Sequence, residues 1–382
     1  MTKNTTEFLI QTIMTIMIIS LITGCASGGT GITGRAAQPA EKTKIGVVTP
    51  LSGDAAFLGQ NVLRSAELTL KYYNLSDQIE LVTEDVQCAG HGADAVKAAS
   101  RLIDIERVQA VIGGACSDET LAMAPLFNSA KVPYITPLTG GQNIDEAGEY
   151  VFRNGPSDIR AGTRPAQEIL SRFKIRNTAL VTDQAAYTKD IAQHFKDEYR
   201  GNIIFEADVP VGESDLRTTA AKIKASGAEG VLILTQDGVS AAFLIKQLRE
   251  EGSDAKIFSN FIAFSPKLTA IAGDAAEGAY IYDPEFEESN PDVKKFLEEY
   301  KKKWGMDSPI PFHTTGTRDA IIMITQAADA RGNHGERIHD WLLAYVREWS
   351  GFNGNATFDK QGNTQTGFVL KQVRGGKLEP IG

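Results

Sequence analysis

The chain has 382 residues, of which 42% are hydrophobic and 23% are charged, and its formal net charge is −9. This length accommodates two domains of ordinary size, and the composition excludes a generally disordered chain. The acidic balance argues against a nucleic-acid partner, because contacts to phosphate groups require a basic surface.

An apolar run near the N-terminus indicates export. The run from Phe8 to Ile22 is shorter than a membrane span and has the length of a signal-peptide core. It leads into Ile22-Thr-Gly-Cys25, which resembles the lipobox of bacterial lipoproteins, where the cysteine carries the lipid. We therefore expect residues 1–25 to be a lipoprotein signal peptide with lipidation at Cys25, and residues 26–42 to be a flexible tether. An uncleaved anchor and a plain secreted form are the alternatives.

Strands and helices alternate through the first part of the folded region. Short apolar runs predict the strands, and apolar positions on one helical face predict the helices. Residues 50–59 form a turn-rich loop. This alternation predicts a parallel sheet with helices on both faces. The expected strands are 44–49, 79–85, 110–113 and 132–136, and the expected helices are 60–73, 93–106 and 117–130.

The same alternation restarts after residue 156 and then gives way to short strands. The expected strands are 178–182, 203–209, 230–234, 256–259 and 278–282, followed near the C-terminus by 356–358, 366–371 and 372–373. The expected helices are 158–173, 187–199, 215–225, 240–251, 291–304, 314–330 and 336–349. The chain therefore consists of two similar α/β halves.

Two cysteines remain after Cys25, and both follow predicted strands. Cys88 follows the strand at 79–85 and Cys116 follows the strand at 110–113. Neighbouring parallel strands would bring both to the same sheet edge, and an exported chain most simply pairs them. A bridge that closes a loop of roughly 30 residues stabilises the fold by about 3–4 kcal/mol. Two free thiols are the alternative.

The stretch from Ala110 to Pro137 carries the strongest indication of a binding site. It predicts a buried strand, a turn at Gly113 and Gly114, and a helix that begins near Ser117. A helix N-terminus offers unpaired N–H groups and a partial positive charge, which suit an anion such as a carboxylate. Ser117 also fits a simple N-cap role.

Ligands of open parallel sheets bind at the carboxyl ends of the strands. The residues at those positions are mostly aromatic, hydroxyl-bearing or amide, which suits a small polar molecule better than a phosphate. They are Phe57, Leu58, Cys88, Cys116, Ser117, residues 138–140, Asp183, Tyr187, residues 236–238, Asn260, Phe261 and residues 282–284.

The motifs of an enzyme are missing from the sequence. It contains no G-x-S-x-G elbow, P-loop or H-E-x-x-H motif, and its five histidines lack metal-ligand spacing. Ser117 has no assignable base in the sequence. We expect no catalytic activity, no metal and no cofactor.

Several motifs in order along the chain resemble the leucine/isoleucine/valine-binding protein family, the type I periplasmic binding proteins of ATP-driven importers. The likeness runs from about residue 44 to residue 377. Its motifs are Ile45-Gly-Val-Val-Thr-Pro-Leu-Ser-Gly53, Cys88 with Cys116-Ser117, Pro133-Tyr-Ile-Thr-Pro137, Tyr150-Val-Phe-Arg153, Asp183-Gln-Ala-Ala-Tyr187, Ala272-Gly-Asp-Ala-Ala-Glu-Gly278 and Phe358-Asp-Lys-Gln-Gly362.

The resemblance implies two Rossmann-like, doubly wound α/β lobes joined by three crossings, which close on a ligand in the cleft between them. Lobe 1 would comprise residues 43–157 and 287–350, and lobe 2 would comprise residues 158–286 and 351–382. The family holds the α-carboxylate of its ligand at positions that correspond here to Ser117 and the loop from Leu138 to Gly140. The tyrosine that packs over the ligand corresponds to Tyr187. The expected ligand-binding residues are Phe57, Leu58, Cys116, Ser117, Leu138, Thr139, Gly140, Tyr187, Asp237, Phe261 and Tyr282.

The sequence departs from the family where amino-acid binders carry a glutamate that pairs with the ligand ammonium. The alignment places Val239 or Ser240 there, and Asp237 is a substitute that also fits turn chemistry. Asp118 and Glu119 crowd the first turn of the Ser117 helix and are expected to weaken its attraction for an anion.

The sequence thus predicts a monomeric, lipid-anchored, extracytoplasmic binding protein of the periplasm or cell surface. It would deliver a small solute to an ABC permease and its ATPase subunits. A branched-chain or other aliphatic amino acid is the first expectation; an amide, a urea-like compound or an organic acid is the second. A ligand sensor or a protein-interaction module with the same fold is the alternative function.

Overall fold

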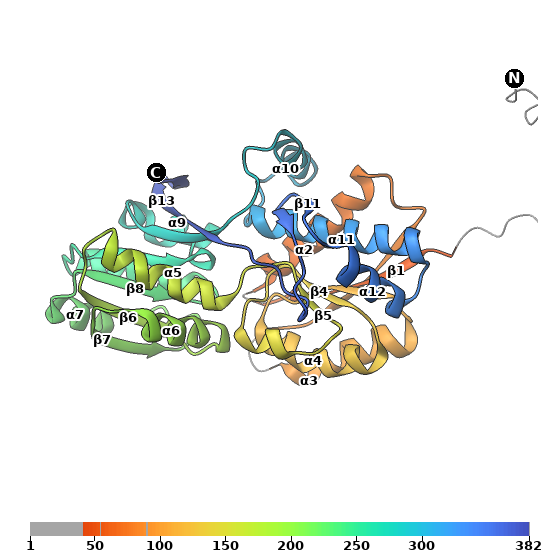
Figure 1. Cartoon of the computed structure of the whole chain (residues 1–382). Helices are drawn as coiled ribbons and strands as arrows, with labels where there is room; N and C mark the ends of the chain where they lie inside the picture. The colour runs from red at the N-terminus through yellow and green to blue at the C-terminus, as the bar shows by residue number, and fades with distance from the viewer. Residues whose placement is uncertain (1–40, 54, 89–90, 382) are drawn as a thin grey trace, which may run out of the picture. The chain divides into compact units, whose positions relative to one another are not determined.

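Two β-sheets organise the computed structural model, which describes residues 41–53, 55–88 and 91–381 (Figure 1). The first sheet has the strand order β2-β1-β3-β4-β5 and all its pairings are parallel. Its strands are β1 (Thr43–Thr49), β2 (Ile79–Asp85), β3 (Ala110–Gly113), β4 (Tyr134–Thr136) and β5 (Val151–Arg153).

The second sheet has the order β14-β13-β10-β9-β8-β6-β7. Strands β6 to β10 pair in parallel, whereas β13 joins β10 and β14 in antiparallel fashion. Its strands are β6 (Asn177–Asp183), β7 (Asn202–Val209), β8 (Gly230–Leu234), β9 (Lys256–Asn260), β10 (Tyr280–Pro284), β13 (Phe368–Arg374) and β14 (Lys377–Pro380).

Helices cover both faces of the first sheet. On one face, Ile321 and Ile324 of α11 pack with Ile45 and Ile112 of the sheet. On the other face, residues of α3 and α4 pack with Val48 and Val111. The elements around this sheet are α2 (Ala56–Tyr72), α3 (Gly92–Ser100), η1 (Arg101–Ile105), α4 (Ser117–Ala130), η2 (Gln142–Glu146), α10 (Pro291–Trp304), α11 (Pro311–Arg331) and α12 (Gly335–Tyr345).

The second sheet is buried in the same way. Leu180, Val231 and Ile233 are inaccessible or nearly so and pack in one cluster with Phe195 of α6 and Leu248 of α8. Strands without polar interruption belong to sheets covered on both faces. The elements around this sheet are α5 (Asp158–Ser171), α6 (Ala186–Glu198), α7 (Arg217–Ser226), α8 (Val239–Glu250), η3 (Phe261–Ala263), α9 (Pro266–Ala272) and η4 (Gly273–Ala276). The doubly wound α/β fold predicted from the sequence is confirmed.

A short antiparallel hairpin follows α12 and packs on elements of the first sheet. It consists of β11 (Trp349–Gly351) and β12 (Gly354–Ala356). Phe352 between them lies in a cluster with Phe296 of α10, and the main-chain N–H of Phe352 donates to Asp319 of α11 at 3.0 Å. Through these contacts the hairpin packs with elements of the first sheet. The lobe boundary expected after residue 350 stays a prediction.

Some predicted element ends are wrong. Helix α2 begins at Ala56 rather than at residue 60, so Phe57 and Leu58 lie in a helix and not in a loop. Helix α12 ends at Tyr345, and Trp349 lies in a strand because Glu348 takes a left-handed φ of 52° that no helix contains. The two short strands expected at 366–373 form the single strand β13.

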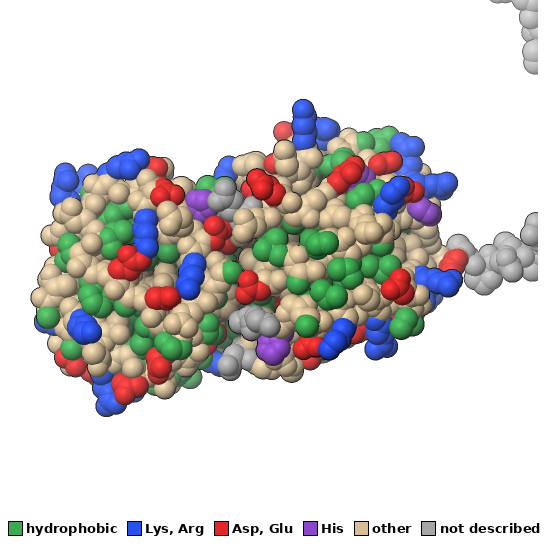
Figure 2. Space-filling model, turned by 90° about the horizontal axis from the view of Figure 1, so that it is seen from below, with side chains coloured by type: hydrophobic (Ala, Val, Ile, Leu, Met, Phe, Trp, Pro, Cys, Tyr) green, Lys and Arg blue, Asp and Glu red, His purple; other side chains and the backbone are tan. Residues whose placement is uncertain are grey.

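No helix within the described residues has both the length and the apolar character needed to cross a membrane. Figure 2 shows one face of the molecule, on which Lys and Arg side chains are interspersed with Asp and Glu. The expected signal peptide, the lipidation at Cys25 and the tether up to residue 40 lie outside the described residues.

Candidate functional site

A small cavity lies where the loops after β3 and β4 meet loops of the second sheet. It leaves about 10 Å³ for the centre of a water molecule, which is room for roughly one water. A solute the size of an amino acid therefore requires the two walls to move apart. The cavity is lined by Ala115, Ser117, Leu138, Thr139, Gly140, Tyr187, Gln236, Phe261 and Ile262.

The first wall begins with the glycine turn after β3. Gly113 and Gly114 have φ values of 131° and 73°, which side-chain-bearing residues rarely adopt. A Cβ atom on Gly114 would lie 2.3 Å from Tyr134 Oη and 2.4 Å from Thr120 Oγ1. The Gly114 carbonyl instead accepts a hydrogen bond from Thr139 Oγ1 at 2.6 Å, and this bond ties the loops after β3 and β4 together.

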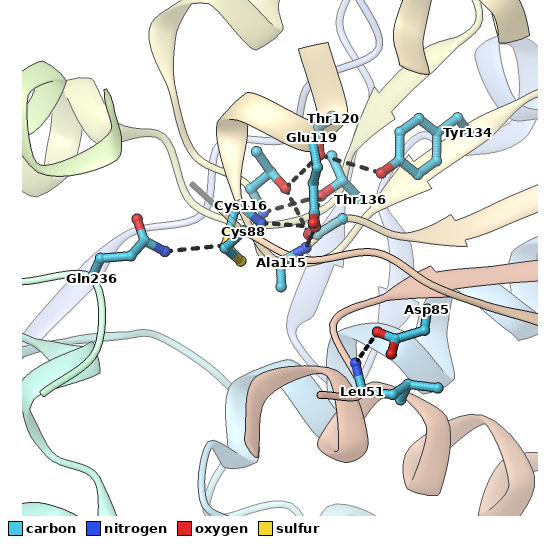
Figure 3. Close-up of a disulfide and its surroundings, with 12 residues drawn as sticks. Leu51, Asp85, Cys88, Ala115, Cys116, Glu119, Thr120, Tyr134, Thr136 and Gln236 are labelled. Atoms are coloured by element: carbon cyan, nitrogen blue, oxygen red, sulfur yellow. Dashed lines mark hydrogen bonds between the residues drawn. A yellow bond between two sulfur atoms is a disulfide. The ribbon is translucent and has the colours of Figure 1, made fainter. Parts of the chain in front are cut away.

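The N-cap of helix α4 is Cys116 (Figure 3). Ser117 is the first residue of the helix. The N-cap role considered for Ser117 is therefore wrong. The Ser117 side chain is buried, and its Oγ has no hydrogen-bond partner in the described part of the chain. A buried hydroxyl without a partner is costly unless a ligand satisfies it.

Glu119 folds back beneath the start of α4 instead of crowding it from outside. Its Oε1 accepts hydrogen bonds from the main-chain N–H groups of Ala115 at 2.7 Å and Cys116 at 3.1 Å (Figure 3). Burial outweighs these bonds and raises the pKa of Glu119 to about 8. Two of the N–H groups that an anion could use are therefore occupied by the chain's own carboxyl group.

Cys88 and Cys116 meet as the sequence predicts. Their sulfur atoms lie at bonding distance and their Cα atoms are 5.7 Å apart (Figure 3). A disulfide between them would fix the residue before Ser117 to the loop that follows β2. Glu119 lies close enough to both cysteines to complete a possible metal-ligand set, but paired cysteines are not thiolate ligands.

A buried carboxylate, Asp158, lies against the loop at Gly140 and Gly141. A Cβ atom on Gly140 would lie 2.1 Å from Asp158 Oδ1, so only glycine permits this approach. The main-chain N–H of Asp158 donates to the Gly140 carbonyl at 2.7 Å, and Arg153 Nη1 donates to the same carbonyl at 3.1 Å. A Cβ atom on Gly141 would lie 2.9 Å from Ser117 Oγ and 3.8 Å from Asp158 Oδ2. The two polar atoms thus both lie within 3.8 Å of one point beside Gly141.

The electrostatic environment of Asp158 is unfavourable for a carboxylate. The residue is 3% exposed, and its Oδ2 has no hydrogen-bond partner among the described residues. Burial, reinforced by the charge of Asp190, raises the pKa of Asp158 well above its ordinary value, and Arg153 opposes the shift. The Arg153 guanidinium is itself paired with Asp145. A positively charged ligand group would compensate Asp158.

The second wall is held by a short hydrogen-bond network. The Asp183 carboxylate at the end of β6 accepts from the Gln236 main-chain N–H at 2.6 Å. Asn260 Nδ2 at the end of β9 donates to Tyr187 Oη at 3.2 Å. Across the cavity, Gln236 Nε2 donates to Cys116 Sγ at 3.2 Å (Figure 3).

The structure brings six of the predicted ligand-binding residues to the cavity lining: Ser117, Leu138, Thr139, Gly140, Tyr187 and Phe261. Their role in binding stays a prediction. The lining also includes Gln236, which the sequence places at a strand end without assigning it to the ligand, and Ala115 and Ile262, which the sequence did not single out. Asp158, which lies against Gly140, was not singled out either. The sequence shows Asp158 only as an acid at the start of the helix that follows Gly155-Pro156, and its burial is not visible there.

The other five predicted residues lie outside the lining. Phe57 and Leu58 are in the first turn of α2, and Cys116 contacts the cavity region through Gln236. Asp237 Oδ1 accepts from the main-chain N–H of Val239 at 3.0 Å, which is the turn chemistry considered for it. Tyr282 borders a separate cavity with Leu232, Leu234 and Phe368.

Known proteins of similar sequence and structure agree on one family. The chain is 25% identical to the leucine-, isoleucine-, valine-, threonine- and alanine-binding protein of Pseudomonas aeruginosa over 85% of this chain and 87% of that protein. It superposes on the leucine-binding protein LivK of Thermotoga maritima with a TM-score of 0.81 and 24% identity, over 89% of this chain and 98% of that one. An R. palustris solute-binding protein in complex with benzoate gives a TM-score of 0.79 and 19% identity, over 90% of this chain and 96% of that one. The family model described as periplasmic binding protein matches residues 42–377, and the chain therefore belongs to the periplasmic binding protein family.

Proposed function

We propose that this protein is the solute-binding component of an ABC importer and that its solute is a free α-amino acid. One observation carries the proposal: Ser117 Oγ and Asp158 Oδ2 are buried, lack partners among the described residues, and lie within 3.8 Å of the same point beside Gly141. An α-amino acid carries an ammonium and a carboxylate group on one carbon atom. It would satisfy both polar atoms at once.

The carboxylate end of the solute would bind at the first wall. The Ser117 hydroxyl supplies a hydrogen-bond donor at the first turn of α4, where the helix dipole favours negative charge. Glu119 occupies the N–H groups of Ala115 and Cys116, and the N–H and hydroxyl of Thr139 donate to Thr136 Oγ1 and to the Gly114 carbonyl. The Ser117 hydroxyl and the loop at Gly140 would therefore have to supply most of the contacts. This end of the site is therefore a modest anion site.

The ammonium end would bind at Asp158. This residue would take the role that the sequence analysis considered for Asp237. An ammonium group would relieve the burial penalty of the carboxylate, and charge-assisted hydrogen bonds of this kind are stronger than neutral ones. Tyr187, which is buried on the second wall, would pack over the bound solute.

An aromatic acid is the second candidate solute, because the benzoate-bound protein shares the fold. Such a ligand has a carboxylate but no ammonium group, so it would leave Asp158 unpaired and add a second negative charge near it. Two like charges in a buried site repel strongly. The arrangement therefore favours the amino acid over the aromatic acid.

Ligand contacts from both walls would favour the closed arrangement of the two lobes, because a ligand stabilises the state to which it binds better. The permease and its ATPase subunits would then take the solute from the closed form. Lipidation at Cys25 would hold the monomeric protein outside the cytoplasm, at the membrane surface. A sensor that uses the same site without transport is the alternative role.

Calorimetry on residues 26–382 tests the proposal. The ligands are a series of α-amino acids, the amine and the hydroxy acid derived from one of them, and benzoate. We expect binding of at least one amino acid and a large loss of affinity for each derivative, since each leaves Ser117 or Asp158 unpaired. Equal binding of the hydroxy acid and the amino acid, or tighter binding of benzoate, would contradict the assignment of Asp158.

A further inference from the structure

Gln236 closes the cavity opposite the start of α4. Its side chain is 6% exposed and reaches across to the first wall, where Nε2 donates to Cys116 Sγ at 3.2 Å (Figure 3). Its main chain is fixed by the hydrogen bond from its N–H to Asp183 Oδ2. Asp183 in turn accepts from Thr188 Oγ1 at 2.7 Å. The side chain is thus presented from a rigid loop.

The hydrogen-bonding capacity of this amide is poorly used. A glutamine side chain offers two N–H donors and a carbonyl oxygen with two lone pairs. Within the described residues, the hydrogen bonds of this side chain reduce to one, and its acceptor is a sulfur atom, which accepts only weakly. Because sulfur is a weak acceptor, a ligand group that offers oxygen or nitrogen atoms would replace this contact with a stronger hydrogen bond.

Gln236 meets a different part of the first wall from Asp158. Asp158 lies against Gly140 and Gly141, whereas Gln236 contacts Cys116, the residue before Ser117. With the ammonium group at Asp158 and the carboxylate at Ser117, the third substituent of an α-amino acid is the one left to reach Gln236. The remaining lining near it is uncharged, with Ala115, Leu138, Phe261 and Ile262.

We infer that Gln236 is a specificity-determining residue that forms a hydrogen bond with a hydroxyl or carboxamide group on the side chain of the solute. The solute is then a polar, uncharged α-amino acid of the serine, threonine, asparagine or glutamine class, and leucine, isoleucine and valine are disfavoured. This inference rests on the proposed function. An amide both donates and accepts, so it pairs with neutral groups that do the same, and it exchanges the weak sulfur contact for a stronger one.

An aliphatic side chain would instead cover the amide and leave its donors without partners. Sites built to hydrogen-bond a substrate group reject analogues that lack the group much more strongly than apolar pockets reject an extra methylene. We therefore expect at least a roughly tenfold preference for threonine or asparagine over valine or leucine, a conservative figure for such a site.

Calorimetric titration of residues 26–382 with threonine, asparagine, valine and leucine tests the inference. Gln236→Leu should lose about tenfold or more in affinity for the polar pair and gain affinity for the aliphatic pair. Gln236→Ala is the second variant, since a smaller side chain keeps the test valid if leucine disturbs folding. Gln193→Leu is the matched control, because Gln193 is exposed on α6 and contacts Asp197; it should leave every affinity unchanged.

The outcomes separate the two proposals. A protein that binds amino acids but prefers valine or leucine, or whose preference survives both Gln236 variants, overturns the role of Gln236 and leaves the proposed function intact. A protein that binds none of the amino acids overturns the proposed function, and this inference falls with it.

Discussion

Replacing Asp158 by asparagine should separate stability from binding. The substitution preserves the shape of the side chain and removes the charge of a residue that is only 3% exposed. In the ligand-free protein this charge is opposed by burial and by the charges of Asp190 and Asp145, while Arg153 and the position at the start of α5 favour it. The unfavourable influences dominate, because the pKa of Asp158 is raised well above its ordinary value.

Asp158→Asn should increase the stability of the protein and decrease its affinity for an amino acid, both by measurable amounts. Removing a buried charge that lacks a partner should raise the free energy of unfolding by about 1–2 kcal/mol in the absence of ligand. At roughly 1–2 °C for each kcal/mol in a folded region of this size, the melting temperature should rise by about 1–4 °C. The same substitution deprives the ligand ammonium of its partner and should weaken amino-acid binding by about 2–4 kcal/mol, or roughly 30- to 1,000-fold.

The stabilisation by Asp158→Asn should depend on pH. A carboxyl group whose pKa is raised by folding contributes stability that is fully present below its unfolded pKa and is lost as pH rises through the folded pKa. The stabilisation from Asp158→Asn should therefore be largest at high pH and disappear in acid, where the native carboxyl is already protonated. Denaturant unfolding at several pH values and calorimetry measure both effects, with Asp197→Asn on the exposed face of α6 as control. A variant that is destabilised, or that binds amino acids normally, would refute the reasoning.

Three further predictions concern the first wall. Ser117→Ala should weaken amino-acid binding by about 1–2 kcal/mol in calorimetry and change the melting temperature little, because its Oγ makes no hydrogen bond in the described chain; a large loss of stability would contradict this. Glu119 should make the protein less stable as pH rises from about 5 to about 8, since folding raises its pKa to about 8, and Glu119→Gln should flatten that slope in denaturant titrations. Thiol alkylation before and after reduction should find Cys88 and Cys116 protected until reduced, and reduction should cost about 3–4 kcal/mol of stability for a sequence separation of 28 residues; free thiols in the untreated protein would contradict the pairing.

Local signals in the sequence predict the elements whose ends are set locally. Strand β8 occupies residues 230–234 as expected, because a run of apolar residues begins at a glycine and ends at a polar loop. Helix α10 occupies residues 291–304 as expected, since the Asn290 side chain caps its start and Gly305 takes a left-handed φ of 72° at its end. In each case neighbouring residues in the sequence contain the reason.

Ends that depend on distant contacts are not predictable in this way. Gly59 reads as a loop residue, yet it lies inside α2. A glycine is needed there because a Cβ atom would lie 1.7 Å from the Pro50 carbonyl oxygen, a contact from a separate loop. Asp158 reads as an ordinary acid in the first turn of a helix. Its burial arises only when Gly140 and Gly141, from a separate loop, pack against it without side chains.

The two buried carboxyl groups of the site should impose opposite limits on binding as pH changes. Asp158 has to be ionised to attract an ammonium group, so affinity should fall in acid as it takes up a proton. Glu119 lies beneath the carboxylate end, and burial raises its pKa to about 8.

Near neutral pH Glu119 is therefore mostly protonated and adds little repulsion against a bound carboxylate, contrary to the weakening expected from the sequence. Above about pH 8 it ionises, and the added negative charge should weaken binding again. Amino-acid affinity measured against pH should thus pass through a maximum. Glu119→Gln should remove the alkaline decline and Asp158→Asn the acid decline. Each variant tests one side of the pH profile. If the alkaline decline persists in Glu119→Gln, or the acid decline persists in Asp158→Asn, another group titrates in that pH range. The charge assigned to that end of the cavity would then be wrong.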